Sequence, residues 1–190
     1  MLFHESTSTQ TMAAQHSPVT KDQVYAAIAD VLDPELDESL VKLGFIEHVQ
    51  VEEQDVTITF KLPTFWCAPN FAYLMAMDLH TRVRALPGVR TARVLLLDHC
   101  ADDEINTGIN SGQSFSEAFP DDASEDADLE HLRQAFLRKG FLMRQDNLLR
   151  QMLKAGLSSE TIVALRIADM HIDEVANSVT LVTPQGTVQL

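Results

Sequence analysis

Apolar and polar residues near the start of the chain repeat with a helical period between residues 20 and 32. Four apolar residues fall on one side of such a helix: Val24, Ala27, Ile28 and Val31. Their spacing of three to four residues predicts an amphipathic helix. Thr20 and Gln23 have the spacing of a capping box at its start. Pro34 ends it, because the residue before a proline is pushed out of the helical region.

Strict alternation of apolar and polar residues follows between residues 56 and 62 and predicts a half-buried strand. The run 45–51 precedes it across a short polar segment, so the two predict an antiparallel hairpin. A second amphipathic helix is predicted over residues 71–86, and a third strand over 91–98. The first half is therefore predicted to be an α-β-β-α-β two-layer sandwich of the α+β class.

The composition changes after the third predicted strand. Residues 98–130 contain eleven acidic residues and no Lys or Arg, which indicates an acidic linker or lid with little order. Beyond it the pattern is helical, with breaks expected near Gly140 and at Gly156, and residues 178–190 predict a closing β-hairpin. The predicted organisation has four parts: a flexible tail (1–18), an α+β domain (19–100), the acidic linker (101–128) and a small helical region ending in the hairpin (129–190).

Composition restricts the classes of function. The chain has 190 residues, 45% of them hydrophobic, and a net charge of −14. Nucleic-acid binding and docking on anionic membranes both need clustered Lys and Arg, so neither is expected. Two cysteines are too few for a disulfide scaffold, no apolar run has the length of a membrane span, and the first residues lack the pattern of a targeting signal. These features predict a cytoplasmic protein.

The predicted topology brings separated residues to one edge of the sheet. If the second and third strands are parallel, they end at the same edge, where the antiparallel first strand begins. Three loops then meet there, and they carry the residues with the most reactive side chains: Asp33, Glu35, Cys67, Asp98, His99 and Cys100. Ligands often bind at this kind of edge in open α/β folds.

The stretch "TFWCAPN" places Cys67 just before the second helix, with Pro69 suited to its first turn. The helix dipole is expected to lower the pKa of this thiol and so to make it a nucleophile or a metal ligand. Trp66 is expected to shield it from water. The alternative is that Cys67 is only a small buried apolar residue.

His99 and Cys100 are interpreted in two ways. They either join Cys67 in a metal site or merely mark the end of a strand. Asp33 and Glu35 likewise either take part in the chemistry or cap the loop between the first helix and the first strand.

These motifs resemble the PaaD/SufT-like domain of iron–sulfur cluster assembly factors. "DPELDESLVKLGF", "TFWCAP" and "LPGVRTARV" match its signature in order and spacing over residues 20–100. The residues that match are Asp33, Pro34, Glu35, Gly44, Thr64 and Cys67. Two positions depart from the pattern: Ala68 separates Cys67 from Pro69, and Lys42 replaces an acidic residue often found before Leu-Gly.

The resemblance implies an α+β fold, a reactive Cys at position 67, and a cytosolic role in maturing iron–sulfur or other metalloproteins. It implies a transient iron or iron–sulfur cargo and a partner that is a client metalloprotein or an assembly-machinery protein. Similar domains accompany bacterial multicomponent oxygenases, so the second half of this chain is a candidate client-specific part.

Three hypotheses of function follow. The first is a non-enzymatic assembly factor that uses Cys67. The second is a metal-independent chaperone or binding module for an oxygenase subunit. The third is a thiol enzyme with His99 as its base, although the sequence contains no complete catalytic constellation. A homodimer remains an open alternative to a monomer.

Overall fold

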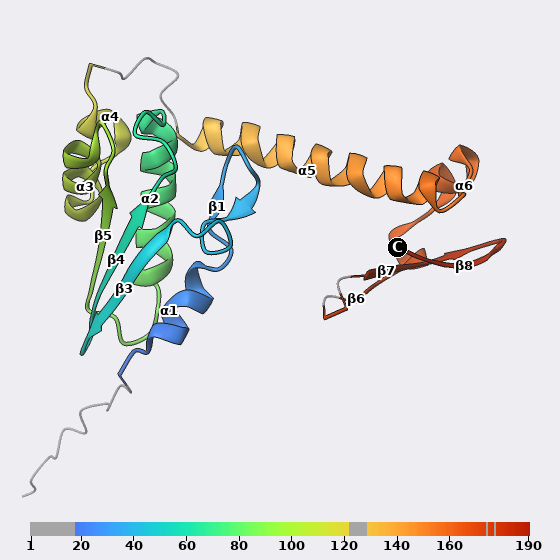
Figure 1. Ribbon diagram of the computed structural model, residues 1–190, viewed down its shortest axis with the longest axis horizontal. Coiled ribbons are helices and arrows are strands. Elements are labelled where there is room, and N and C mark those ends of the chain that lie inside the picture. Colours follow the sequence, from blue (N-terminus) through green and yellow to red (C-terminus); the bar gives the residue numbers. More distant parts are fainter. Residues whose placement is uncertain (1–17, 122–128, 174, 177) are drawn as a thin grey trace, which may run out of the picture. The chain divides into compact units, whose positions relative to one another are not determined.

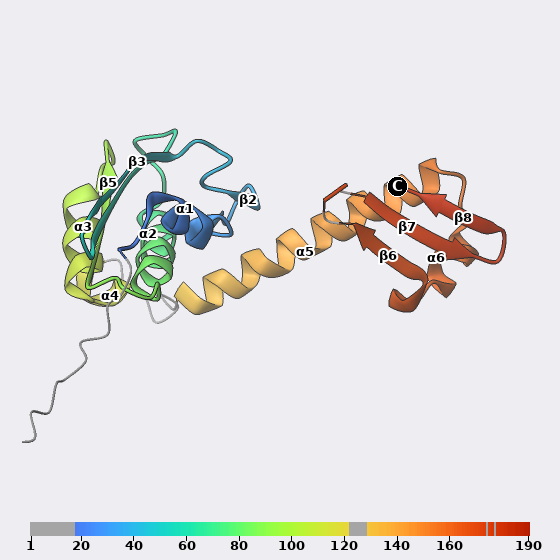
Figure 2. The same cartoon turned by 90° about the horizontal axis from the view of Figure 1, so that it is seen from below.

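The computed structural model describes the chain in four stretches: residues 18–121, 129–173, 175–176 and 178–190. The chain divides into two compact units, of which the first ends at His131 and the second runs from Leu132 to Leu190. Each unit has its own sheet. Figures 1 and 2 show the elements of both units along the chain.

The first unit is built on a three-stranded sheet with the order β3-β4-β5. β3 (Ile46–Glu52) and β4 (Asp55–Lys61) form the expected antiparallel hairpin, and β5 (Thr91–Leu97) pairs in parallel with β4. α2 (Pro69–Arg84) is the crossover between the parallel strands. The α-β-β-α-β order expected from the sequence is therefore confirmed.

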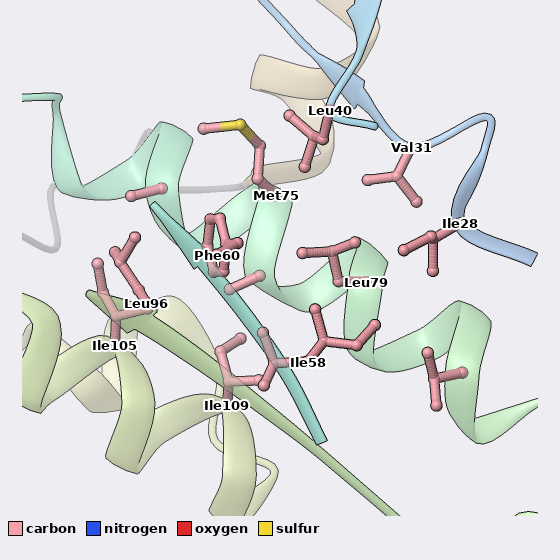
Figure 3. Packing of buried hydrophobic residues seen from close by; sticks show 14 of the residues in the cluster. Ile28, Val31, Leu40, Ile58, Phe60, Met75, Leu79, Leu96, Ile105 and Ile109 are labelled. Atoms are coloured by element: carbon pink, nitrogen blue, oxygen red, sulfur yellow. The ribbon is translucent and has the colours of Figure 1, made fainter. Parts of the chain in front are cut away.

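The helices of this unit pack on one face of the sheet, so the architecture has two layers. Alternate residues of β4 and β5 are buried under α2: Val56, Ile58, Phe60, Ala92, Val94 and Leu96. Leu79 and Met75 of α2 meet them from above (Figure 3). The other face is partly exposed and more polar, as the alternation predicts for such a hairpin.

α1 (Lys21–Ile28) begins with the expected capping box, in which Thr20 accepts a hydrogen bond from the Gln23 backbone and the Gln23 side chain returns to the Thr20 backbone. The helix is shorter than the predicted span of 20–32. Leu32 and Asp33 instead form β1 (Leu32–Asp33), which pairs with β2 (Glu38–Ser39). The ribbon between α1 and β3 is thus a small two-stranded turn that carries the Asp-Pro-Glu motif.

The expectation of a poorly ordered linker after β5 differs from the structure over residues 101–121. This segment contains α3 (Asp102–Ser111) and α4 (Phe115–Ala118). Five of its apolar side chains belong to the core: Ala101, Ile105, Ile109, Phe115 and Phe119. The acidic residues Asp102, Asp103 and Glu104 occupy the first turn of α3, where the helix dipole favours them. The acidic composition of this segment therefore led to a linker being predicted where the chain forms a helix. The remaining linker residues 122–128 lie outside the described part of the chain.

α3 also protects the free edge of β5 (Figures 1 and 2). The side-chain amides of Asn106 and Asn110 each accept a hydrogen bond from one backbone N–H of β5 and donate to one backbone carbonyl, at Leu96 and Val94 respectively. An unpaired strand edge is a template for aggregation. Asn106 and Asn110, which are one helical turn apart, thus make the backbone hydrogen bonds that a fourth strand would otherwise make.

The second unit has one long helix, two short helices and a three-stranded antiparallel sheet. Its elements are α5 (Leu129–Lys154, beginning in the first unit), α6 (Ser159–Ala164), the 3₁₀ turn Ile167–Asp169, β6 (Met170–Asp173), β7 (Ser178–Thr183) and β8 (Gly186–Gln189). The expected hairpin is β7-β8, and β6 adds a third strand beside β7. α5 runs through Gly140 without the expected break, because one internal glycine costs a helix only about 1 kcal/mol.

Candidate functional site

The loops that follow β4 and β5 lie together at one edge of the sheet of the first unit. The parallel register ends with Lys61 opposite Leu97, so both strands finish at the same level. Asp98 follows β5 directly and forms an ion pair of 2.5 Å with Lys61 at the end of β4. The convergence expected from the topology is therefore what the structure shows for the 64–67 and 98–100 stretches.

Two hydrogen bonds fasten these loops to each other. The backbone N–H of Cys100 donates to the carbonyl oxygen of Phe65 at 3.0 Å. The imidazole Nε2 of His99 lies 2.8 Å from the carbonyl oxygen of Cys67. The chain on both sides of Trp66 is thereby held against the loop that follows β5.

His99 is a structural bridge in this loop. Its side chain is 2% exposed, and its Nδ1 accepts a hydrogen bond from the Ala101 backbone N–H at 3.1 Å. Because Nδ1 accepts, the proton of a neutral imidazole is on Nε2, which donates to Cys67. Both ring nitrogens are occupied, which argues against the ligand role expected for His99 and against its role as a base for Cys67.

Cys67 is partly buried and lies two residues before Pro69, which opens α2. Burial raises the pKa of its thiol, and the negative charges of Asp33 and Glu35 and the neighbouring Cys100 raise it further. The Ala68 backbone N–H acts in the opposite direction. The direction is therefore opposite to the expected lowering of this pKa: desolvation and nearby carboxylates outweigh the backbone hydrogen bond at the helix end.

The Asp-Pro-Glu turn is held by its own first residue. One carboxylate oxygen of Asp33 accepts hydrogen bonds from the backbone N–H groups of Glu35 and Leu36, at 2.8 and 2.9 Å. Asp33 thus caps the turn, as one of the two interpretations has it, while its charge and that of Glu35 still act on Cys67. Gly44 closes the same region with a φ of 72°, which suits glycine because it has no Cβ to clash.

Trp66 is 79% exposed and packs edge-on against Phe65, with ring centroids 4.9 Å apart. Because the Trp66 ring is largely exposed to solvent, it covers little of any neighbouring side chain. This exposure argues against the expected shielding of Cys67. Thr64, the residue that opens the turn, is also exposed. The aromatic pair is visible in the sequence, but its exposure depends on how the loop is held.

The metal-ligand set expected from the sequence is only partly assembled. Cys67 and Cys100 are both free thiols, and they are close enough to interact electrostatically. Across the residues that the structure describes, no group of three or more His, Cys, Asp or Glu side chains is arranged to hold a metal ion. The metal role of Cys67 and Cys100 therefore stays a prediction, and the hydrogen bonds of His99 argue against it as a third ligand.

Comparison with known proteins defines the class. The sequence model of the family described as "Iron-sulfur cluster assembly protein" matches residues 21–96, which include α1, the Asp-Pro-Glu turn, the sheet and Cys67. An uncharacterized protein of Methanocaldococcus jannaschii is 34% identical over 90 residues, or 46% of this chain and 92% of that relative. The chain belongs to the iron–sulfur cluster assembly protein family through its first unit.

The match to the family ends before α3 begins. The family match stops at residue 96, so α3 and α4, which complete the core of the first unit, lie beyond it. The whole of the second unit also lies beyond it. As for the membrane, none of the helices in the described stretches has the length and apolar character needed to cross one.

Proposed function

We propose that this protein helps to mature a client protein that contains iron or an iron–sulfur cluster, and that Cys67 is the thiol that contacts the metal or the client. One observation carries the proposal. Within the segment that the family match covers, Cys67 lies at the sheet edge next to a second thiol, Cys100, because the 98–100 loop is hydrogen-bonded to the 64–67 loop. The coarse role, iron–sulfur cluster assembly, follows from the family.

The chemistry of the two thiols fits a transient contact. Iron–sulfur clusters are held by cysteine thiolates, usually four of them. Cys67 and Cys100 would supply part of such a set, and thiols of the client or of a delivering protein would supply the rest. Cargo held by shared ligands passes on when the partner's thiolates replace those of this protein. In this scheme the iron or cluster is cargo.

The raised pKa of Cys67 is consistent with a contact that forms only when metal is delivered. A thiol with a raised pKa is mostly protonated near neutral pH and is therefore a weak nucleophile toward unwanted partners. Metal binding displaces the proton, because thiolate is the ligand form. His99 then acts as a positioning residue, since it holds the carbonyl of Cys67 against the neighbouring loop.

The second candidate is a metal-independent chaperone or binding module for a subunit of a multicomponent oxygenase. The exposure of Trp66 beside Cys67 favours it, because an exposed tryptophan on a fixed loop suits protein recognition. In this version the thiol is incidental. Both candidates place the protein in the cytoplasm, which stays a prediction.

A reconstitution experiment tests the metal role. The full chain, purified without oxygen, is incubated with ferric iron, sulfide and a thiol reductant, and iron and sulfide per chain are measured. Transfer to an apo-ferredoxin is then followed by circular dichroism in the visible range. The Cys67→Ser variant should lose transfer while its far-ultraviolet spectrum is unchanged. The Cys100→Ser variant should retain reduced transfer.

Full loading and transfer by the Cys67→Ser variant would contradict the metal role of this thiol. If wild-type protein takes up no iron but still binds its client, the chaperone candidate is favoured instead. Cys100→Ser is the comparison variant, because Cys100 is the more exposed of the two thiols and adventitious binding should depend on it at least as strongly.

A further inference from the structure

We propose that Trp66, Phe65 and the acidic loops around them form a docking surface for a basic, apolar segment of a protein partner. We call this the Trp66 surface. The proposal gives the class of partner that would bind at the site described above, and it therefore rests on the proposed function. Three features of the described residues carry it: exposure, fixed backbone and charge.

Exposure comes first. Trp66 is 79% exposed and Phe65 47%, although both are large apolar side chains. Leu36, in the Asp-Pro-Glu turn whose charges act on Cys67, is 56% exposed. Single exposed apolar residues are common on protein surfaces. A tryptophan stacked edge-on against a phenylalanine is a different case, because tryptophan is enriched among the residues that dominate binding energy.

The second feature is the fixed backbone beneath the aromatic pair. The carbonyl of Phe65 accepts a hydrogen bond from Cys100, and the carbonyl of Cys67 accepts one from the buried His99. Trp66 lies between these two anchored residues. A side chain on a fixed backbone loses less conformational entropy when a partner binds, so it contributes more to affinity.

The third feature is the sign of the charge around the pair. The loops 33–37, 64–70 and 98–104 contain no Lys or Arg. Their charged residues are Asp33, Glu35, Asp37, Asp98, Asp102, Asp103 and Glu104. Two cations close to these loops in the sequence are in ion pairs: Lys61 with Asp98, and Lys42 with Glu38. A partner that fits therefore presents Lys or Arg around an apolar patch.

Charge also decides between kinds of partner. Aromatic residues insert into membranes as well as into proteins, but anionic lipids would be repelled by the carboxylates of these loops. Nucleic acids would be repelled for the same reason. In a symmetric dimer through this surface, the acidic loops of two copies would face and repel each other. The complementary occupant is a basic apolar segment of another protein.

Trp66 is the chain's single tryptophan, so its fluorescence reports on this surface alone. The probes are three synthetic peptides: an amphipathic helix with a Leu face bordered by Lys and Arg, the same peptide with Glu at each basic position, and oligolysine of equal charge. The first should saturate and shift the emission to shorter wavelength, and salt should weaken it. The acidic peptide should have no effect, and oligolysine should bind more weakly.

Variants separate local recognition from general attraction to an acidic protein. Binding of the labelled basic amphipathic peptide is measured by fluorescence anisotropy. Trp66→Ala should weaken it by about tenfold or more, as expected for a hot-spot residue. Glu35→Gln with Asp103→Asn should weaken it severalfold. The matched control, Glu52→Gln with Glu53→Gln, removes two charges at the opposite end of the β3-β4 hairpin and should change binding less than about twofold.

Equal binding by Trp66→Ala and wild type, equal binding of the three peptides, or equal losses in the two charge variants would overturn the proposal. No response to the basic peptide would also overturn it. If sedimentation shows a doubled mass that is lost in Trp66→Ala, the occupant of the Trp66 surface is a second copy of this chain and the proposal is wrong. If the Trp66 emission shifts on addition of phosphatidylcholine–phosphatidylglycerol vesicles, the occupant is a membrane and the proposal is wrong.

The outcome is distinguishable from failure of the metal role. Trp66→Ala is expected to take up iron and sulfide like wild type while losing the peptide. Cys67→Ser is expected to bind the peptide while losing cluster transfer. If Cys67→Ser transfers normally and Trp66→Ala still loses the peptide, the docking surface stands and the proposed metal function does not.

Discussion

His99 links the two loops of the site through opposite sides of one ring, with Nε2 2.8 Å from the carbonyl oxygen of Cys67 and Nδ1 accepting from the Ala101 backbone. The ring is buried, so its loss would leave a cavity and two unsatisfied backbone groups. We expect His99→Ala to lower the free energy of unfolding by about 2–4 kcal/mol. Urea unfolding followed by circular dichroism measures this.

The control is His48→Ala, because His48 is exposed on β3 of the same unit. It should change stability by less than about 0.5 kcal/mol. A His99→Ala variant that is as stable as wild type but binds no iron would restore the ligand role that its hydrogen bonds argue against.

Asn106 and Asn110 are expected to matter more than their partly exposed positions on α3 suggest. Each bonds both a backbone N–H and a carbonyl on the edge of β5. Replacing either by Ala leaves these groups without their partners and should cost about 1–3 kcal/mol. The double variant should also aggregate, because the strand edge is freed. Light scattering and thermal unfolding check both effects.

Ser111, on the same helix, is a suitable comparison because its side chain bonds only to backbone carbonyls of its own helix. Ser111→Ala should be nearly neutral. Asparagine variants that unfold like Ser111→Ala would show that solvent or another segment can satisfy the β5 edge.

Gly108 in α3 faces the ring of Tyr73. A Cβ built there would lie 2.8 Å from Tyr73 Oη and 2.9 Å from Ala118 Cβ. Helix propensity alone predicts that Gly→Ala stabilises by up to about 1 kcal/mol. Overpacking of a filled core costs about 1–3 kcal/mol, and Tyr73 is also held by its hydrogen bond to the Gln113 carbonyl. We therefore expect net destabilisation of Gly108→Ala in thermal unfolding. A raised melting temperature would show that Tyr73 moves aside freely.

Alkylation tests the electrostatics of Cys67. Burial first, and then the charges of Asp33 and Glu35, raise its pKa. Removing one charge with Glu35→Gln lowers that pKa and increases the thiolate fraction below it. In metal-free protein with Cys100→Ser, iodoacetamide should react with Cys67 about two- to threefold faster near neutral pH. The advantage should vanish at pH well above the pKa, where both proteins are fully ionised.

Glu52→Gln serves as the matched charge removal, because Glu52 lies at the far end of β3 from the site. It should leave the alkylation rate unchanged. If both variants react faster by the same factor, the effect comes from overall charge, and the specific influence of Glu35 is refuted.

Truncation distinguishes the folded unit from the span predicted as a domain. A chain ending at residue 131 keeps α3 and α4 and should fold. A chain ending at residue 100 lacks Ile105, Ile109, Phe115 and Phe119, which are buried in the core. Loss of each costs about 2–4 kcal/mol, which together exceeds the usual stability of a domain. Amide-proton NMR spectra of the two fragments decide, and a folded 1–100 fragment would contradict the structure.

The α-β-β-α-β order was predictable because each element has a local signal. The Thr20–Gln23 capping box, the alternation along β4 and Pro69 at the start of α2 all act within a few residues. The acidic segment after β5 misled the sequence analysis, because its many carboxylates were given more weight than the helical spacing of its apolar residues Ala101, Ile105 and Ile109. What they pack against, Tyr73 and the edge of β5, is distant in the sequence.

The sequence by itself determined the α-β-β-α-β elements of the first unit, the parallel connection through α2 and the meeting of the Cys67 and Cys100 loops, since these follow from local patterns and chain order. Only the tertiary structure decided what the residues at that edge do. Burial and neighbouring carboxylates set the direction of the Cys67 pKa, both nitrogens of His99 are taken by backbone groups, and Trp66 is left in solvent. The physical reason is that desolvation, hydrogen-bond partners and exposure depend on residues brought together by folding.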